Sequence, residues 1–332
     1  MFKIKFLPLL VIIIFPNIQY AQFTDAINSN RPGESMTAFS VGKTVIQAEL
    51  GFYGIKEDHS VKDYTISGYG SDLQVRYGAF FEQLELILNL QYQNDNYVSP
   101  YIDENRSGLK KTIIGAKYLL YDPDKNYKKK INIYSWKANH KFSWRQFIPA
   151  VGLYGGLHVN LSNNAFAKSK YNIGIPVDPK ITTRAILLTQ NQFGKSVLVG
   201  NIIIDKYPSI KRSIDYVVTL TRVISPRFSG FIEAQGINGD YYKDTFLRGG
   251  GAYLLQENIQ LDASISKNFK ETPNVLYGGV GISWRFDQNY NDVLLRIPKD
   301  KEAKGKDKKK DKKDKKKDKA KKRLDEIEGE KK

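Results

Sequence analysis

The sequence predicts an all-β fold, a transmembrane antiparallel up-and-down β-barrel of about twelve strands (range ten to fourteen). Between residues 43 and 286, apolar and polar side chains alternate in segments of roughly nine to thirteen residues, as membrane strands do. After residue 21, no apolar stretch has the ~18 residues of a membrane helix. The chain also has 21 Tyr, 17 Phe, 26 Gly and no Cys. This composition fits strands with aromatic girdles and excludes disulfides, catalytic thiols and a lipidated cysteine.

The N-terminus has the three parts of a signal peptide. Met1 to Lys5 contains two lysines, Phe6 to Phe15 is apolar, and Ala21 supplies a small residue for cleavage. The apolar run is about half as long as a spanning helix requires. We therefore predict a signal peptide over residues 1–21, cleavage after Ala21, and export of the mature chain.

The strand candidates follow the signal in an order that an up-and-down barrel explains. Four of them alternate most regularly, over residues 44–54, 72–79, 84–92 and 258–265. The other eight are 108–121, 147–160, 181–193, 196–205, 213–222, 228–236, 245–255 and 275–286. Two of these, around 186–188 and 202–204, are apolar on both faces and could instead be buried sandwich strands. An even total leaves both chain ends on one side of the membrane.

The connections are expected to alternate between long outer loops and short periplasmic turns. Long loops are predicted over 56–71, 93–107, 161–180, 237–244 and 267–274. Segment 122–146 breaks the rule, because it is long where a short turn is expected, and it could contain an extra strand or a periplasmic hairpin. The last strand ends in Trp284-Arg285-Phe286, as closing strands of such barrels do, but 46 residues follow it.

Short motifs after the signal resemble a known family. They are Asn30-Arg31-Pro32-Gly33-Glu34-Ser35, Ser40-Val41-Gly42-Lys43 and Gln47-Ala48-Glu49-Leu50-Gly51, with partial matches at 115–118, 121–123 and 231–236. The chain resembles the phenol meta-pathway outer-membrane β-barrel family, whose Bacteroidetes members are usually called transporters. The resemblance spans most of residues 28–286. It implies a barrel and suggests transport, without identifying a ligand.

The alternation also predicts which polar side chains face the lumen. The candidates are Glu49, Asp72, Arg76, Glu85, Lys117, His158, Glu233, Asp262 and Arg285. They could line an aqueous conduit, or they could pair across a modest bore and seal it. Residues 22–42 form a leader that could fold inward as a small plug. Arg31 would then reach a lumen carboxylate and Pro32-Gly33 would make a turn. The alternative is an extended leader outside the barrel.

Nothing in the sequence predicts catalysis, a metal site or a cofactor. His59, His140 and His158 are scattered, and none is in the outward His-x-Ser arrangement that barrel lipid hydrolases display. A lipid hydrolase is therefore the least favoured function.

The end of the chain, residues 287–332, is predicted to be a disordered, lysine-rich tail. Lys299 to Arg323 contains 16 basic and 6 acidic residues and no apolar core. Export removes nucleic acid as a partner, and the nearer polyanions are periplasmic peptidoglycan and anionic lipid headgroups. We expect an outer-membrane barrel, surrounded by lipid, that passes a small solute, with hydrophobic or aromatic compounds as the candidate class. The alternative is a non-conducting anchor whose tail contacts the cell wall.

Overall fold

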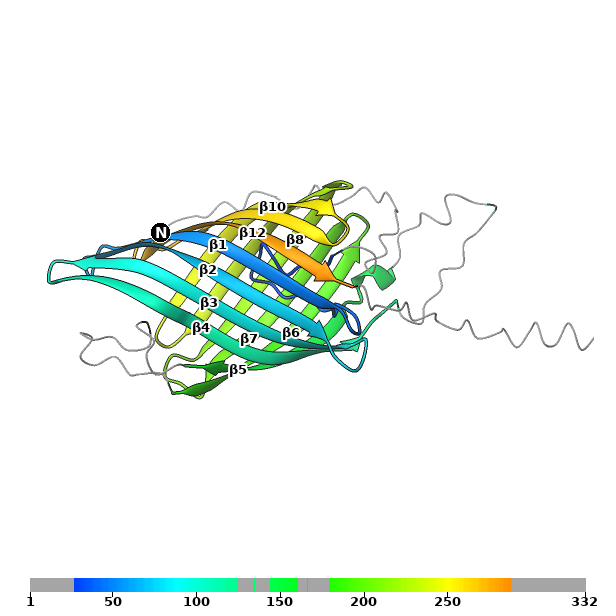
Figure 1. The fold of residues 1–332 in the computed structure, drawn as a ribbon, viewed down its shortest axis with the longest axis horizontal. Coiled ribbons are helices and arrows are strands. Elements are labelled where there is room, and N and C mark those ends of the chain that lie inside the picture. The colour runs from blue at the N-terminus through cyan, green and yellow to red at the C-terminus, as the bar shows by residue number, and fades with distance from the viewer. Residues whose placement is uncertain (1–26, 125–133, 135–143, 161–165, 167–178, 288–332) are drawn as a thin grey trace, which may run out of the picture. The chain divides into compact units, whose positions relative to one another are not determined.

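The structure is a computed structural model that describes residues 27–124, 134, 144–160, 166 and 179–287. These residues form a closed barrel of antiparallel strands (Figure 1). The strands are β1 (Ile46–His59), β2 (Tyr64–Gly78), β3 (Leu84–Ser99), β4 (Ile102–Tyr121), β5 (Ala150–Val159), β6 (Ile181–Phe193), β7 (Ser196–Tyr207), β8 (Ser213–Ser225), β9 (Phe228–Gly239), β10 (Lys243–Gln256), β11 (Ile259–Asn268) and β12 (Asn274–Phe286).

Each strand pairs with the next, and β1 closes the ring by pairing with β12. In this closing ladder Gly51 lies opposite Gly281, and Ile46 lies opposite Phe286. Closure pairs the backbone of every strand on both sides, which leaves no free sheet edge. The predicted fold class and the count of twelve strands are therefore confirmed among the described residues.

Side chains alternate between the outside of the barrel and its lumen. On β1, Phe52 is exposed while Glu49 is fully buried, and on β4, Ile114 is exposed while Lys117 is fully buried. The alternation follows from the two-residue period of a strand, which sends successive side chains to opposite faces. The outer surface is consequently apolar, and the inner surface is largely polar.

Most of the predicted long loops are wrong. Four of the five predicted loops are short connections in the structure, over residues 60–63, 100–101, 240–242 and 269–273. Of the five, only the connection over 160–180 is long. The strands extend into the segments that we expected to be loops, and β4 has 20 residues. A strand needs about 9–11 residues to cross a membrane, so β1 to β4, with 14 to 20 residues each, continue well past that length. Pairing with the neighbouring strands stabilises these extensions. Their outer faces are polar, so the sequence pattern does not identify them as membrane strands.

The segment between β4 and β5 is long, as its sequence indicated. The described part of it includes one short 3-10 helix, η1 (Trp144–Phe147). The possible extra strand or hairpin within 122–146 lies largely outside the described residues. The predicted signal peptide and lysine-rich tail also lie outside them. No helix among the described residues is long and apolar enough to cross a membrane.

The two strands with apolar residues on both faces are barrel strands, so the sandwich alternative is wrong. Their inner-face residues Ile186, Leu188 and Ile203 belong to a buried cluster that also contains Met36 and Ala38. Met36 and Ala38 precede β1 in the sequence. The lumen of the barrel therefore contains a hydrophobic core, made where the segment before β1 packs against inner-face residues of β3 to β8.

Candidate functional site: the lumen and its inner segment

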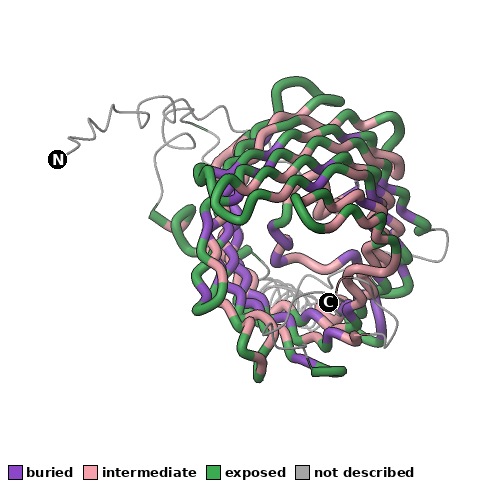
Figure 2. The backbone as a smooth tube through the Cα atoms, turned by 90° about the vertical axis from the view of Figure 1, so that its left-hand side faces the viewer, coloured by how far each residue is buried: buried purple, intermediate pink, exposed green. Residues whose placement is uncertain are grey.

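Residues 27–45, here called the inner segment, lie inside the barrel. In Figure 1 this dark-blue start of the described chain runs between the walls of the barrel, and in Figure 2 a buried stretch lies within the ring. Ile27 enters beside the turn between β10 and β11, where its N–H donates to the carbonyl of Glu257 at 3.0 Å. This turn is at the end of the barrel where β1 begins and β12 ends, here called the terminal end. The opposite end is called the loop end.

Side chains from the barrel wall bind the backbone of the inner segment, because that backbone forms no strand of its own. The N–H groups of Asn30 and Arg31 donate to the Glu49 carboxylate. Further along, backbone N–H groups donate to inward-facing side chains of four other strands. These pairs are Glu34 and Ser35 with Glu233, Met36 with Asn201, Ala38 with Gln190, and Val41 with Glu85. The inner segment therefore crosses the lumen and contacts strands around the whole ring.

Arg31 anchors the inner segment to two strands. Its guanidinium donates to both carboxylate oxygens of Asp262 on β11, at 3.3 and 3.2 Å, and it also forms an ion pair with Asp72 on β2. The guanidinium lies over Gly51 and Gly281, where an added Cβ would come within 2.1 Å and 2.4 Å of its nitrogen atoms. This pair of facing glycines makes the space that Arg31 occupies.

The charges around the inner segment favour the ionised forms of its own side chains. Burial alone would lower the pKa of Arg31, but the carboxylates of Asp72 and Asp262 raise the pKa above its ordinary value. For Glu34, burial in the lumen would raise the pKa, but the positive charges of Arg248, Lys111 and Arg184 lower it. The Glu34 side chain is 54% exposed to the space of the lumen, so water in the lumen weakens this second effect.

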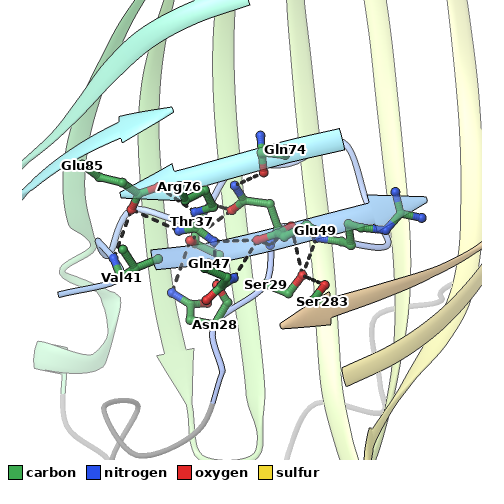
Figure 3. Close-up of polar contacts among 12 residues, drawn as sticks. Asn28, Ser29, Thr37, Val41, Gln47, Glu49, Gln74, Arg76, Glu85 and Ser283 are labelled. Atoms are coloured by element: carbon green, nitrogen blue, oxygen red, sulfur yellow. Dashed lines mark hydrogen bonds and ion pairs between the residues drawn. The ribbon is translucent and has the colours of Figure 1, made fainter. Parts of the chain in front are cut away.

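A buried ion network lies below the inner segment, toward the terminal end. Arg76 pairs with Glu49 at 3.0 Å and with Glu85 at 2.6 Å, and Glu85 pairs with Lys117 at 3.0 Å. All four side chains are fully buried. Figure 3 shows Glu49, Arg76 and Glu85 of this network beside the inner segment, where Arg76 donates to the carbonyl of Asn28 at 2.6 Å. Because unpaired charges are costly to bury, the network fixes the wall and the inner segment together.

All nine side chains that the alternation predicted to face the lumen lie on the inner faces of their strands. Most of them pair either with one another or with the inner segment. The remaining contacts are those of Glu233 with Arg248, His158 with Asp205 at 2.7 Å, and Arg285 with Asp287 at 3.7 Å. In the leader, Gly33 lies against the Glu233 carboxylate, 2.5 Å from where its Cβ would be. Arg31 reaches lumen carboxylates, as described above.

Several residues of the site were missed by sequence reasoning. Gln190 and Asn201 bind the backbone of Ala38 and Met36, and Asn201 both accepts from and donates to Met36. A signal for them exists, because each is an amide beside apolar residues of the inner face: Gln190 follows Leu188 on β6, and Asn201 precedes Ile203 on β7. The basic residues Lys110, Lys111, Arg184 and Arg248 were also missed. Lys110 and Lys111 are adjacent, so strict alternation does not allow both of them to face the lumen.

A cavity of about 350 Å³ lies between the inner segment and the barrel wall. Residues 30–36 form one boundary of it, and the rest is lined from ten strands by polar and apolar side chains. Its volume falls within the range of small-molecule sites. Among the described residues, no group of three His, Asp or Glu side chains could hold a metal ion.

A family model matches residues 29–286, which is most of the chain. The chain belongs to the family described as "Putative MetA-pathway of phenol degradation". The matched residues of this family member include the inner segment from Ser29 onward as well as all twelve strands. A search of curated proteins found no match.

Solved structures similar to this family member are also β-barrels. An outer membrane channel from Pseudomonas putida F1 is 13% identical, with a TM-score of 0.49, and the match covers 77% of this chain and 99% of that one. The KdgM porin is 10% identical, with a TM-score of 0.42 and coverage of 72% and 99%. The CymD monoaromatic hydrocarbon channel is 10% identical, with a TM-score of 0.38 and coverage of 73% and 88%.

Proposed function

We propose that this member of the family is an outer-membrane channel for passive transport of a small solute, with the inner segment as a removable plug. The proposal includes export by the signal peptide and a periplasmic location for both chain ends. It also includes a solute that is hydrophobic or aromatic, in keeping with the family's description. The protein has no catalytic role in this proposal.

The outer surface of the barrel supports a membrane location. Large apolar side chains are exposed on every strand, among them Phe52, Ile114, Leu157, Ile202, Ile232 and Val280. Aromatic residues are exposed toward the terminal end at Tyr77, Tyr118, Tyr253 and Trp284, and toward the loop end at Tyr69 and Tyr216. In water, an apolar surface this continuous would drive aggregation. An apolar band between aromatic girdles is what lipid requires of a barrel.

The manner in which the inner segment is held carries the proposal of a plug. Its contacts with the wall are hydrogen bonds, ion pairs and one apolar cluster. No residue of the inner segment belongs to a strand, because the first strand begins at Ile46. A chain segment bound only by such contacts can leave without breaking the barrel's own ladder. Its departure would open the cavity of about 350 Å³ toward the terminal end.

A reducible tether tests the plug directly. The hydroxyl oxygens of Ser29 and Ser283 are 2.8 Å apart, and the chain has no cysteine of its own. Ser29→Cys with Ser283→Cys should therefore form a disulfide after a small adjustment, since bonded sulfur atoms lie about 2.05 Å apart. In planar bilayers, we expect few current steps from the oxidised protein and frequent steps after reduction. The single Ser29→Cys variant is the control and should be indifferent to reductant.

The outcomes separate the channel from its alternatives. Equal current from the oxidised and reduced forms would show that residues 27–45 do not gate the barrel. Silence of the wild type, the reduced variant and a variant that lacks residues 28–42 would reject the channel. A channel that conducts but discriminates no solute in liposome swelling would leave transport in place and reject the solute class.

A second candidate function rests on the C-terminal tail. Lys299 to Arg323 carries ten more basic than acidic residues. A tail of this charge would bind acidic cell-wall groups or anionic headgroups, and a closed barrel would then serve as a membrane anchor. Salt-sensitive association of the full protein with isolated sacculi, lost on deletion of residues 299–332, would support this function. Association that survives the deletion would reject it.

A further inference from the structure

A group of basic side chains on one side of the cavity is not accounted for by the plug. Five basic and two acidic side chains line the cavity. Two of the basic groups are already paired, Arg31 with Asp72 and Asp262, and Arg248 with Glu233. Lys110, Lys111 and Arg184, here called the basic site, remain.

The partners of the basic site within the described chain are weak. The ammonium of Lys110 donates to the neutral amide of Gln93 at 2.8 Å. Lys111 has no hydrogen bond or ion pair with a described residue. Arg184 has its Nε 3.7 Å from Asp205, too far for a hydrogen bond, and this buried nitrogen has no hydrogen-bond partner among the described residues. Buried donors of this kind normally have partners, so the site has capacity for an additional acceptor.

The backbone is shaped to build this site. On β4, Lys111 pairs with Gln91 and Leu109 pairs with Tyr92, so Lys110 is an extra residue opposite no partner. This β-bulge breaks the alternation and lets two consecutive lysines line the same cavity. A second irregularity lies beside Arg184, between Thr183 and Ala185 in the pairing of β6 with β7. Bulges are often found where a sheet must re-aim side chains at a binding site.

Apolar side chains line the same cavity beside the basic site. They include Ile113, Ile186, Phe246 and the ring of Tyr154. Ligand cavities typically combine such a surface with a few convergent polar groups. A ligand with an apolar body and one negative group would therefore contact both the apolar and the basic side chains.

The inner segment already places a carboxylate in the same cavity, that of Glu34. Glu34 lies 4.0 Å from Arg248, and its pKa is lowered by the charges of Arg248, Lys111 and Arg184 despite burial. With five basic and two acidic side chains, the lining of the cavity has a net positive charge. A ligand carboxylate placed there would compete with Glu34.

We propose that the basic site binds a small organic anion with an apolar body, such as an arenecarboxylate, and that this anion competes with Glu34 for the cations. The proposal rests on the proposed channel, because it assigns the class of solute that the cavity holds. Binding and conduction can nevertheless be measured separately.

Equilibrium binding to the detergent-solubilised full chain tests the site without requiring conduction. The probes are benzoate, with acetate, phosphate, benzyl alcohol and benzylammonium for comparison. Benzoate should bind at least about tenfold more tightly than each of the others, because it alone offers both a carboxylate and a ring. Lys111→Gln with Arg184→Gln should weaken benzoate binding about tenfold or more. Lys56→Gln is the matched control, since Lys56 is exposed on β1 and does not line the cavity.

The proposed competition also predicts a variant that binds benzoate more tightly than the wild type. Glu34→Gln removes the internal carboxylate and should strengthen benzoate binding several-fold, whereas a purely structural role for the basic site predicts no gain. Equal binding of benzoate and phosphate would overturn the apolar part of the proposal. Equal binding to wild type and to the Lys111→Gln, Arg184→Gln variant would overturn the site.

Bilayer currents separate this inference from the proposed channel. A wild type that conducts but favours cations over anions, and that benzoate does not block, would reject the anion site and leave the channel intact. A wild type that never conducts but binds benzoate through Lys111 and Arg184 would reject the channel and leave the site intact.

Discussion

Arg31 binds both carboxylate oxygens of Asp262 although the two residues are 231 positions apart in the chain. Arg31 belongs to the segment that crosses the lumen, and Asp262 belongs to β11, the second-to-last strand in the sequence. This ion pair thus joins the inner segment to the strand beside the closing strand.

Removal of the Arg31 side chain should release the inner segment. Arg31→Ala leaves the carboxylates of Asp72 and Asp262 without their partner, and an unpaired buried charge is costly. We expect the open probability in planar bilayers to rise by at least about tenfold, which corresponds to roughly 1.4 kcal/mol. Arg227→Ala, in the exposed turn between β8 and β9, should behave as wild type. An unchanged open probability would mean that this ion pair does not hold the plug.

The glycine pair under Arg31 gives a steric version of the same test. A Cβ at residue 281 would lie 2.4 Å from Nε of Arg31, so Gly281→Val should displace the guanidinium without changing any charge. Gly278→Val on the same strand is the control, because nothing lies within 4 Å of its Cβ position. We expect Gly281→Val to conduct like Arg31→Ala. If both glycine variants conduct alike, the close approach of Arg31 to Gly281 does not affect the open probability.

The buried network around Arg76 should contribute to the stability of the barrel itself. Arg76→Gln leaves Glu49 and Glu85 with less compensation in a fully buried position. We expect a loss of about 3–5 kcal/mol in the free energy of unfolding, the usual cost of breaking a buried pair. Urea unfolding in detergent micelles measures it, with the exposed Arg222→Gln on β8 as the control. A loss no larger than that of the control would contradict the assignment.

Acidification should loosen the inner segment only at low pH. The pKa of Glu34 is lowered from 4.5 when the segment is docked, so docking gains from its charge above that value and loses the gain as pH falls through the lowered pKa. From neutral pH to about 4.5 the contribution of Glu34 to docking should therefore stay constant. Below that, the open probability should rise, by a few-fold at most for this partly exposed group. Glu34→Gln should open more often at neutral pH, and the difference from wild type should shrink as the pH falls.

The class of fold was predictable because it depends on a local property. The two-residue period of β1, β2, β3 and β11 is visible in adjacent residues. Glu49, Asp72 and Asp262, which it predicts to face inward, lie on the inner faces of their strands. Strand ends were not predictable in the same way. The extensions of β3 and β4 around 93–107 are polar on their outer face, so nothing in the local sequence separates them from loops, and only pairing between the strands defines them.

Some residues of the candidate site were likewise predictable from the sequence, and others were not. Nine lumen-facing side chains followed from alternation, but Lys110 and Lys111 did not, because a β-bulge is visible only when both paired strands are placed. Gln190 and Asn201 were missed because their role is to bind a backbone more than a hundred residues away.

The sequence alone determined a barrel with an apolar outer face and a charged inner face, since side-chain direction along a strand depends only on the period of the pattern. The tertiary structure decided what occupies the lumen. Whether Arg31 meets Asp262, and whether Met36 packs on Ile203, depends on contacts between distant segments that no local pattern encodes. Such contacts exist only after the ring has closed and brought both partners to the same height within it.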